Sequence, residues 1–206
     1  MKVAVLGGTG RVGSSFIKYA TEQDVQIRAL VRDKEKALRL FPQAEILEGN
    51  ALNREDLSEL IKGCDVVFSA LNTDKTTTLS TAMPKIIKEM EEAGVDRILT
   101  IGTAGILNSR YEQGKYRYET KESKRTKSFA AEEHLKAFIS LKNSQLQWTI
   151  VCPTHLPDGK RIGKVRSERE YLPKDGKKIG VADTAFFAYR ELIESRFLHS
   201  RVGISY

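Results

Sequence analysis

Four glycines fall within seven residues near the start of the chain, in the stretch VLGGTGRVG, residues 5–13. Gly8, Gly10 and Gly13 match the pattern G-x-G-x-x-G, between an apolar segment and a segment with helical periodicity. Glycines at this spacing permit a tight turn, and they let the backbone approach a pyrophosphate beside a helix N-terminus. The stretch therefore predicts a pyrophosphate-binding loop, to which Thr9, Arg11 and Val12 can add contacts. No lysine follows the glycines as phosphoryl-transfer loops require, so that chemistry is not expected.

A basic residue stands about twenty positions later, in LVRDKEK. Folds that bind NAD place Asp or Glu at this point to accept a hydrogen bond from the ribose 2′-hydroxyl. Arg32 instead suits a 2′-phosphate, and Lys36 lies one helical turn further on. Asp33 is interpreted as a helix cap. The sequence thus favours NADP(H) over NAD(H); the alternative is that Arg32 lies in solvent and the site does not distinguish the two.

Two later segments end in small or amide side chains that suit the rest of a dinucleotide. EGNAL follows the third predicted strand and places Asn50 and Ala51 where the adenine is expected. FSALNT follows the fourth and places Ala70, Leu71 and Asn72 near the nicotinamide ribose. Both follow the carboxyl ends of strands, where doubly wound folds bind their ligands.

Apolar strand-like segments alternate evenly with amphipathic helical segments through the first half of the chain. This alternation predicts an α/β fold: a Rossmann-type doubly wound parallel sheet with helices on both faces. One domain over residues 1–206 is expected, with segments 152–180 contributing the substrate side. The expected strands are 3–6, 26–31, 44–47, 66–70, 97–101, 148–151 and 202–205. The expected helices are 11–23, 33–40, 55–61, 77–93, 124–141 and 183–195.

The composition is that of an ordinary globular protein, with 40% hydrophobic and 30% charged residues among 206. No apolar run is long enough to span a bilayer, and no cleavable leader is recognised, so no membrane partner is expected. Cys64 and Cys152 lie far apart without metal-ligand spacing. We predict buried free thiols, no metal site and a reducing, cytoplasmic location.

The formal net charge of +7 is concentrated in two polar segments. Residues 108–127 hold seven Lys or Arg against three Asp or Glu, and residues 156–178 hold eight against four. These segments are either solvated surface or a positive rim that attracts an anionic cofactor or substrate. A nucleic-acid partner is not expected, because no DNA- or RNA-binding signature accompanies the charge.

Motifs along the whole chain resemble those of atypical short-chain dehydrogenases in the NmrA-like family, in the subgroup of biliverdin IXβ reductase and NADH-flavin reductases. The motifs are KVAVLGGTGRVG, ALVRD, DVVFSAL, RILTIGTAGIL, AAEEHLKAF, WTIVCPTHL and IGVADTAFFAY. The resemblance implies cofactor contacts at Gly7, Thr9, Gly10, Arg11, Val12, Arg32, Asn50, Ala51, Ala70 and Leu71. It also implies that Thr103 lies near the nicotinamide, with Pro153 and His155 beside the substrate pocket. The chain has Asn50 where relatives often carry Asp, and Thr103 where they often carry Ser.

Standard short-chain dehydrogenases use a Tyr-x-x-x-Lys pair on the helix before the sixth strand, and this helix has no tyrosine. Tyr111 and Lys115 have the spacing but fall in a polar loop, so we interpret the match as chance. Hydride transfer to a flavin needs no such general base. Thr103 is then predicted to orient the nicotinamide amide or donate to the acceptor, and His155 to line the acceptor site. His134, on the same helix, is expected at the surface.

Four aromatic residues are candidates for a lid over a flavin or tetrapyrrole: Tyr111, Tyr116, Tyr118 and Phe129. The alternative is that they pack the loop onto the domain.

Two functions therefore remain open. The first is an NADP(H)-dependent reductase of a flavin or similar conjugated acceptor, with the flavin as substrate rather than prosthetic group and with an anionic or aromatic acceptor favoured. The second is a non-catalytic sensor of the nicotinamide pool that engages a protein partner. An isomerase or epimerase is a third, less favoured idea, since it would also be expected to need the absent tyrosine. We expect a monomer or a weak homodimer.

Overall fold

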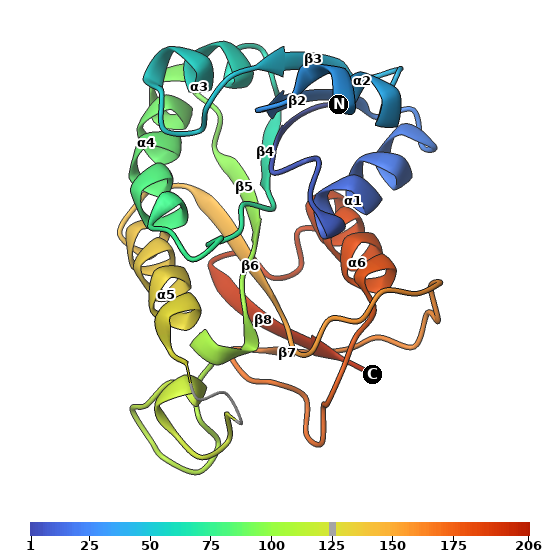
Figure 1. The fold of residues 1–206 in the computed structure, drawn as a ribbon. Helices are drawn as coiled ribbons and strands as arrows, with labels where there is room; N and C mark the ends of the chain where they lie inside the picture. The colour runs from blue at the N-terminus through green and yellow to red at the C-terminus, as the bar shows by residue number, and fades with distance from the viewer. Residues whose placement is uncertain (124–126) are drawn as a thin grey trace.

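The computed structural model describes residues 1–123 and 127–206 and forms an α/β fold around one eight-stranded sheet (Figure 1). The strand order is β3-β2-β1-β4-β5-β6-β8-β7. Every neighbouring pair is parallel except β7 with β8 at one edge. The chain runs outward from β1 to β3 and then returns to the other side of β1, which creates a switch point between β1 and β4.

The element bounds follow the expected alternation closely. The strands are β1 (Lys2–Leu6), β2 (Gln26–Val31), β3 (Glu45–Glu48), β4 (Val66–Ser69), β5 (Arg97–Ile101), β6 (Gln147–Pro153), β7 (Arg166–Arg169) and β8 (Ser200–Ser205). The helices are α1 (Arg11–Thr21), α2 (Lys34–Leu40), α3 (Arg54–Ile61), α4 (Thr78–Ala93), α5 (Phe129–Lys142) and α6 (Val181–Glu194). Two short 3₁₀ helices, η1 (Ala104–Ile106) and η2 (Arg117–Glu119), follow β5.

Alternate residues of the central strands feed two separate cores, one on each face of the sheet. Ala4 and Leu6 of β1 pack with the apolar faces of α3, α4 and α5, whereas Val3 and Val5 pack with α1 and α6. Figure 1 shows the two helical layers on opposite sides of the sheet. The predicted fold class, a single α/β domain with helices on both faces of a mostly parallel sheet, is therefore confirmed.

Local caps set where the helices begin. Asp33 accepts a hydrogen bond from the backbone N–H of Lys36 at 2.9 Å, as the sequence predicted. Asn53 likewise accepts one from the backbone N–H of Asp56 at 2.9 Å. Gly94, with a positive φ of 68°, ends α4.

The second half differs from expectation in two places. The helix expected over 124–141 begins at Phe129, and its first three expected residues lie outside the described residues. The segment 156–178, expected to be loop, contains β7, whose residues Arg-Ser-Glu-Arg hold no apolar side chain. β7 exists because it pairs antiparallel with the buried β8, which is a tertiary effect that periodicity cannot reveal. No described helix is both long and apolar enough to cross a bilayer.

Candidate active site

The carboxyl ends of six parallel strands, β1 to β6, meet along one edge of the sheet, and a cavity of about 700 Å³ lies over them. Strand register places Leu6 of β1 beside Ser69 of β4, and Ile101 of β5 beside Val151 of β6. The turns after these strands therefore line one cavity, which we call the main cavity. All of the residues predicted to contact the cofactor line it: Gly7, Thr9, Gly10, Arg11, Val12, Arg32, Lys36, Asn50, Ala51, Ala70, Leu71, Thr103 and Pro153.

The glycine-rich turn packs so tightly that side chains would disrupt it at some positions and not at others. A Cβ on Gly7, whose φ is +71°, would lie 2.5 Å from the carbonyl oxygen of Ala70 after β4. A Cβ on Gly13 would lie 2.9 Å from the carbonyl carbon of Gly7 and closer still to its oxygen. A Cβ on Gly10 would meet only the Gly7 oxygen, at 3.2 Å, with otherwise open space around it. Gly7 and Gly13 thus close the turn, and Gly10 keeps its cavity side open.

The first turn of α1 presents unused hydrogen-bond donors at this opening. Gly10 occupies the N-cap without a side-chain cap, and among the described residues no group accepts from the backbone N–H groups of Arg11, Val12 or Gly13. Free N–H groups and the positive end of the helix dipole favour a phosphate there. The open face of Gly10 and these donors together fit the pyrophosphate of a dinucleotide.

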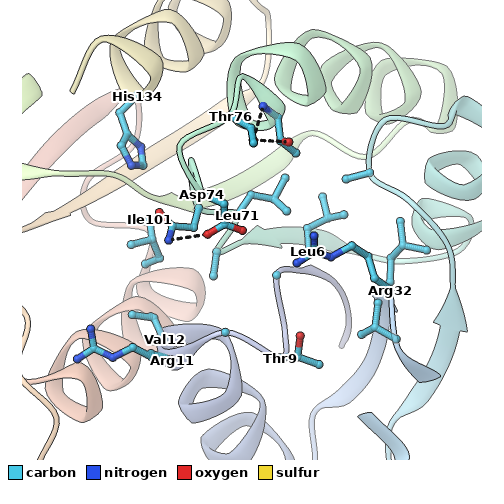
Figure 2. A pocket seen from close by; sticks show the side chains of 18 of the residues that line it. Leu6, Thr9, Arg11, Val12, Arg32, Leu71, Asp74, Thr76, Ile101 and His134 are labelled. Atoms are coloured by element: carbon cyan, nitrogen blue, oxygen red, sulfur yellow. Dashed lines mark hydrogen bonds between the residues drawn. The ribbon is translucent and has the colours of Figure 1, made fainter. Parts of the chain in front are cut away.

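Two cations lie at the end of the cavity formed by β2. Arg32 and Lys36 are exposed, line the cavity, and have no ion pair or side-chain hydrogen bond with any other described residue. Figure 2 shows Arg32 at one end of the cavity and His134 toward the other. This end can therefore neutralise an anionic group.

Asn50 occupies the turn after β3 with its orientation fixed. The side-chain Oδ1 of Asn50 accepts a hydrogen bond from the backbone N–H of Leu52 at 2.9 Å. The backbone N–H of Asn50 donates to the Asp56 carboxylate at 2.7 Å. Because a backbone N–H can only donate, the atom facing Leu52 is the oxygen, and the side-chain NH₂ is the group left to donate elsewhere.

Thr103 follows β5 and Pro153 is the last residue of β6, and these two strands lie on the other side of β1 from β2, which precedes Arg32. The Thr103 hydroxyl accepts from the backbone N–H of Gly105 at 3.4 Å and donates to no described residue, so its proton remains available. Thr103 can therefore donate one hydrogen bond into the cavity.

The helix α5 precedes β6, which is the position of the Tyr-x-x-x-Lys pair in standard short-chain dehydrogenases. Its residues lining the main cavity, one turn apart, are Ala130 and His134. His134 is half-buried there, so the expectation that it lies on the surface is wrong. Tyr111 is 81% exposed and lines neither described cavity. In the described parts of the chain, the main cavity has no tyrosine in its wall.

A second, smaller cavity of about 420 Å³ adjoins the first, and we call it the side cavity. It shares Thr103, Pro153 and Thr154 with the main cavity. His155, predicted at the acceptor site, lines the side cavity and does not line the main one. Of the four aromatic residues predicted as a lid, only Tyr118 lines either described cavity.

The remaining wall of the main cavity combines the turn after β4 with a loop that arrives from the far end of the chain. Asn72 donates to Asp74 at 3.1 Å, and both line the cavity. Arg11 donates to Asp158 at 2.9 Å and to the carbonyl oxygen of Leu156 at 2.6 Å, which ties this loop to the start of α1. No local pattern predicts the Asp158 contact, because the two partners are 147 residues apart in the chain.

The basic segments are partly neutralised in the fold. Arg110 pairs with Glu168, and Arg117 pairs with Glu122 at 3.4 Å. Two of the basic side chains counted in these segments are therefore paired with carboxylates, and fewer remain to form a positive rim. Among the described residues, no cluster of three or more His, Cys, Asp or Glu side chains is arranged to hold a metal ion.

The fold and the site define a dinucleotide-binding Rossmann protein. The match to the family model described as NAD(P)H-binding extends over residues 7–194, and the chain belongs to that family. It is similar to a quinoline-oxide ketoreductase from Stigmatella aurantiaca, at 29% identity over 118 residues. That match covers 52% of this chain but only 35% of the ketoreductase.

Two solved structures share the fold at low sequence identity. One is a proposed NADH-flavin reductase from Streptococcus pneumoniae, with a TM-score of 0.80 and 24% identity over 100% of this chain and 99% of that one. The other is the anaerobilin reductase ChuY from Escherichia coli, with a TM-score of 0.81 and 20% identity over 98% of this chain and 97% of that one. At these identities the likeness establishes the fold alone.

Proposed function

We propose that this protein is an NADPH-preferring reductase that passes hydride to a flavin or a similar conjugated acceptor. The observation that carries the proposal is the junction of the two cavities at Thr103, Pro153 and Thr154. A dinucleotide whose pyrophosphate lies at Gly10 and whose ribose phosphate lies at Arg32 would extend toward that junction. Solved proteins of the same fold include reductases of flavin and bilin type by name.

Cofactor preference follows from the two unpaired cations beside β2. Arg32 and Lys36 would hold the 2′-phosphate, since no described acid competes for either side chain. The NH₂ of Asn50 would donate to the adenine, because its oxygen already accepts from Leu52. The nicotinamide supplies a hydride when bound, so NADPH and a proton would be consumed, and NADP⁺ and the dihydro form of the acceptor would be produced.

The residues at the junction would align the two rings. Thr103 would donate to the nicotinamide amide or to the acceptor, and Pro153 would provide an apolar wall on both sides. Alignment at contact distance is most of what hydride transfer between rings requires, so a positioned phenol is not needed. His134, in the wall from α5, would lie toward the nicotinamide end rather than the adenine end.

Steady-state oxidation of NADPH and of NADH with flavin mononucleotide as acceptor tests the proposal. We expect Arg32→Ala to lower kcat/KM for NADPH by roughly 10- to 100-fold, the worth of a charge-assisted contact of about 1.5–3 kcal/mol. The NADH value should change less than about twofold, because NADH carries no 2′-phosphate. Arg39→Ala is the matched control, because Arg39 lies on α2, is exposed, and lines neither described cavity. Equal loss with both cofactors, or none, would contradict the assignment of Arg32.

The rival function is a sensor that binds the nicotinamide cofactor without turnover and acts through a protein partner. The observation that favours it is the pair Ala130 and His134, which leaves α5 without a tyrosine or a lysine at the cavity. Tight NADPH binding with no turnover on flavins, tetrapyrroles or quinones would support the sensor and exclude the reductase.

We also propose a reducing, cytoplasmic setting and a monomer or weak homodimer. Cys64 and Cys152 are both free and buried, which supports the first point. Light scattering across a concentration series measures the second.

A further inference from the structure

The main cavity contains one acidic side chain in a wall whose other fixed charges are positive. Asp74 is the only carboxylate among the described residues that line it, and Arg11, Arg32 and Lys36 line it as cations. A carboxylate repels a pyrophosphate and a 2′-phosphate, so phosphate binding does not account for Asp74. The part of the dinucleotide that a carboxylate can attract is the nicotinamide ring, which is cationic when oxidised and neutral when reduced.

Hydrogen bonds within the turn after β4 orient the Asp74 side chain. The side-chain oxygen of Asn72 accepts from the backbone N–H of Thr73 at 2.8 Å, so the Asn72 NH₂ is the group that donates to Asp74, at 3.1 Å. The backbone N–H and the hydroxyl of Thr76 both donate to the Thr73 carbonyl, at 2.6 and 2.9 Å. Among the described residues, no lysine or arginine forms an ion pair with Asp74. The carboxylate is therefore held in place without a neighbouring cation to cancel its charge.

The same turn has an unusual backbone. Asp74 and Lys75 have φ values of 44° and 58°, in the left-handed region that residues other than glycine rarely occupy. Aspartate tolerates this region better than most residues, whereas lysine has no such preference. Consecutive residues of this kind are costly, and they concentrate at ligand sites, where the surrounding structure maintains them. In this conformation Asp74 lines the cavity and Lys75 does not.

The topology places Asp74 on the side of the cavity away from the 2′-phosphate cations. Asp74 follows β4, and β4 and β5 lie on the other side of β1 from β2, which precedes Arg32. Figure 2 shows Asp74 on the same side of Leu6 as Ile101 and His134, with Arg32 on the other side. With the 2′-phosphate at Arg32, the nicotinamide end of an extended dinucleotide would lie on the Asp74 side.

We propose that Asp74 makes the main cavity distinguish the oxidised from the reduced cofactor. Its carboxylate stabilises the positive ring of NADP⁺ and has no matching interaction with the neutral ring of NADPH, whereas its repulsion of the phosphates is nearly the same for both. The inference rests on the proposed placement of the cofactor and not on the proposed acceptor, so it applies to a reductase and to a sensor alike. In a reductase, the same carboxylate would stabilise the positive charge that develops on the ring as hydride leaves.

Equilibrium titration of the two oxidation states tests the proposal without an acceptor. NADPH is followed by its fluorescence and NADP⁺ by its displacement of NADPH, with the wild type and with Asp74→Asn. Asparagine can accept the same hydrogen bond from Asn72 and tolerates a positive φ, so the variant removes the charge and keeps the turn. We expect the ratio of the NADPH to the NADP⁺ dissociation constant to fall by at least about threefold at low salt, and by less at high salt. At about 30 mV per tenfold for a two-electron couple, a threefold fall raises the potential of the bound cofactor by about 14 mV.

A fragment and two control variants separate the ring from the phosphates. 2′-Phospho-ADP-ribose has the phosphates but no nicotinamide, so Asp74→Asn should change its affinity by the same factor as that of NADPH. Asp24→Asn is the matched control, because Asp24 also has a positive φ, of 55°, is exposed, and lines neither described cavity. This control should leave all three dissociation constants unchanged. Asp158→Asn, which frees Arg11 from its ion pair, should change both oxidation states equally and leave the ratio as it is.

The outcomes are distinct from those of the proposed function. An unchanged ratio in Asp74→Asn would overturn the discrimination, and so would failure of the wild type to bind either oxidation state. Reduction of flavin by a protein whose ratio does not depend on Asp74 would leave the reductase standing without this role for the carboxylate. A ratio that depends on Asp74 in a protein that reduces no acceptor would keep the discrimination and remove the reductase.

Discussion

Two single substitutions in the glycine-rich turn should have different effects. Gly10→Ala should weaken cofactor binding with little change in stability, whereas Gly13→Ala should lower the stability of the fold. Gly10 has φ −78° and ψ 172°, which alanine adopts without strain, and its Cβ would meet only the Gly7 oxygen at 3.2 Å. Replacing glycine by alanine at a compatible position stabilises by about 0.4–1 kcal/mol through the unfolded state, and the tight contact offsets part of that gain. We therefore expect Gly10→Ala to change the free energy of unfolding by less than about 1 kcal/mol.

Gly13→Ala has the opposite balance. Alanine is favoured over glycine inside a helix by about 1 kcal/mol. The Cβ, however, would lie 2.9 Å from the Gly7 carbonyl carbon and 3.0 Å from the Gly8 Cα, which are backbone atoms that cannot rotate away. Overpacking of this kind costs about 1–3 kcal/mol or more. We expect a net loss near 2 kcal/mol, which in a chain of 206 residues lowers Tm by roughly 4–8 °C.

Thermal unfolding measures the Tm of each variant, and titration with NADPH measures its affinity for the cofactor. Gly10→Ala should unfold within about 3 °C of wild type yet bind NADPH at least about tenfold more weakly, since its methyl group fills space that the pyrophosphate needs. Gly13→Ala should show the lower Tm of the two variants, by the roughly 4–8 °C worked out above. Wild-type affinity in Gly10→Ala would refute the placement of the pyrophosphate, and an unchanged Tm in Gly13→Ala would refute the close packing of the turn.

Two further predictions concern charged contacts. Asp158→Asn should release Arg11 from its exposed ion pair and tighten NADPH binding by up to about fivefold, the worth of such a pair, as a fluorescence titration would measure; weaker binding would show that the pair supports the site. Burial by itself raises the pKa of Glu133, but hydrogen bonds from Lys136 and Ser80 outweigh it and hold the pKa below the ordinary 4.5. These two contacts to the ionised Glu133 therefore stabilise the fold above about pH 4.5, and their contribution is lost as the pH falls further. Ser80→Ala removes one of them, so it should flatten the decline of Tm between about pH 5 and pH 3. An unaltered decline of Tm in this variant would contradict the assignment.

The first half of the fold was predictable because each signal there is local. Asp33 and Asn53 cap their helices through side chains three residues from the bonded N–H, and residues 3–6 of β1 form an unbroken apolar run. The placement of the predicted cofactor residues around one cavity follows from the same cause. Parallel strands in register bring their carboxyl ends together, so residues that end strands share an edge.

The features that were missed depend on contacts between distant segments. His134 reaches the main cavity only because α5 packs against α4 with that face turned inward, which a helix with hydrophobic residues on several sides does not reveal. The pairing of β7 with β8 and the contact of Arg11 with Asp158 join segments separated by more than thirty residues. His155 lines the side cavity and not the main one, and the sequence alone could not show that this edge of the sheet carries two cavities.

The two cavities also bear on the proposed reductase, because its chemistry would differ from that of standard short-chain dehydrogenases. A reaction that moves a proton from a hydroxyl needs a base in contact with that hydroxyl, and the described wall of the main cavity lacks the tyrosine that standard short-chain dehydrogenases use. Ring-to-ring hydride transfer needs two planar molecules held against one another, and the shared residues Thr103, Pro153 and Thr154 are where molecules in the two cavities would meet. A sensor would need only the first cavity. The side cavity is therefore the feature whose occupancy would separate the two proposed functions.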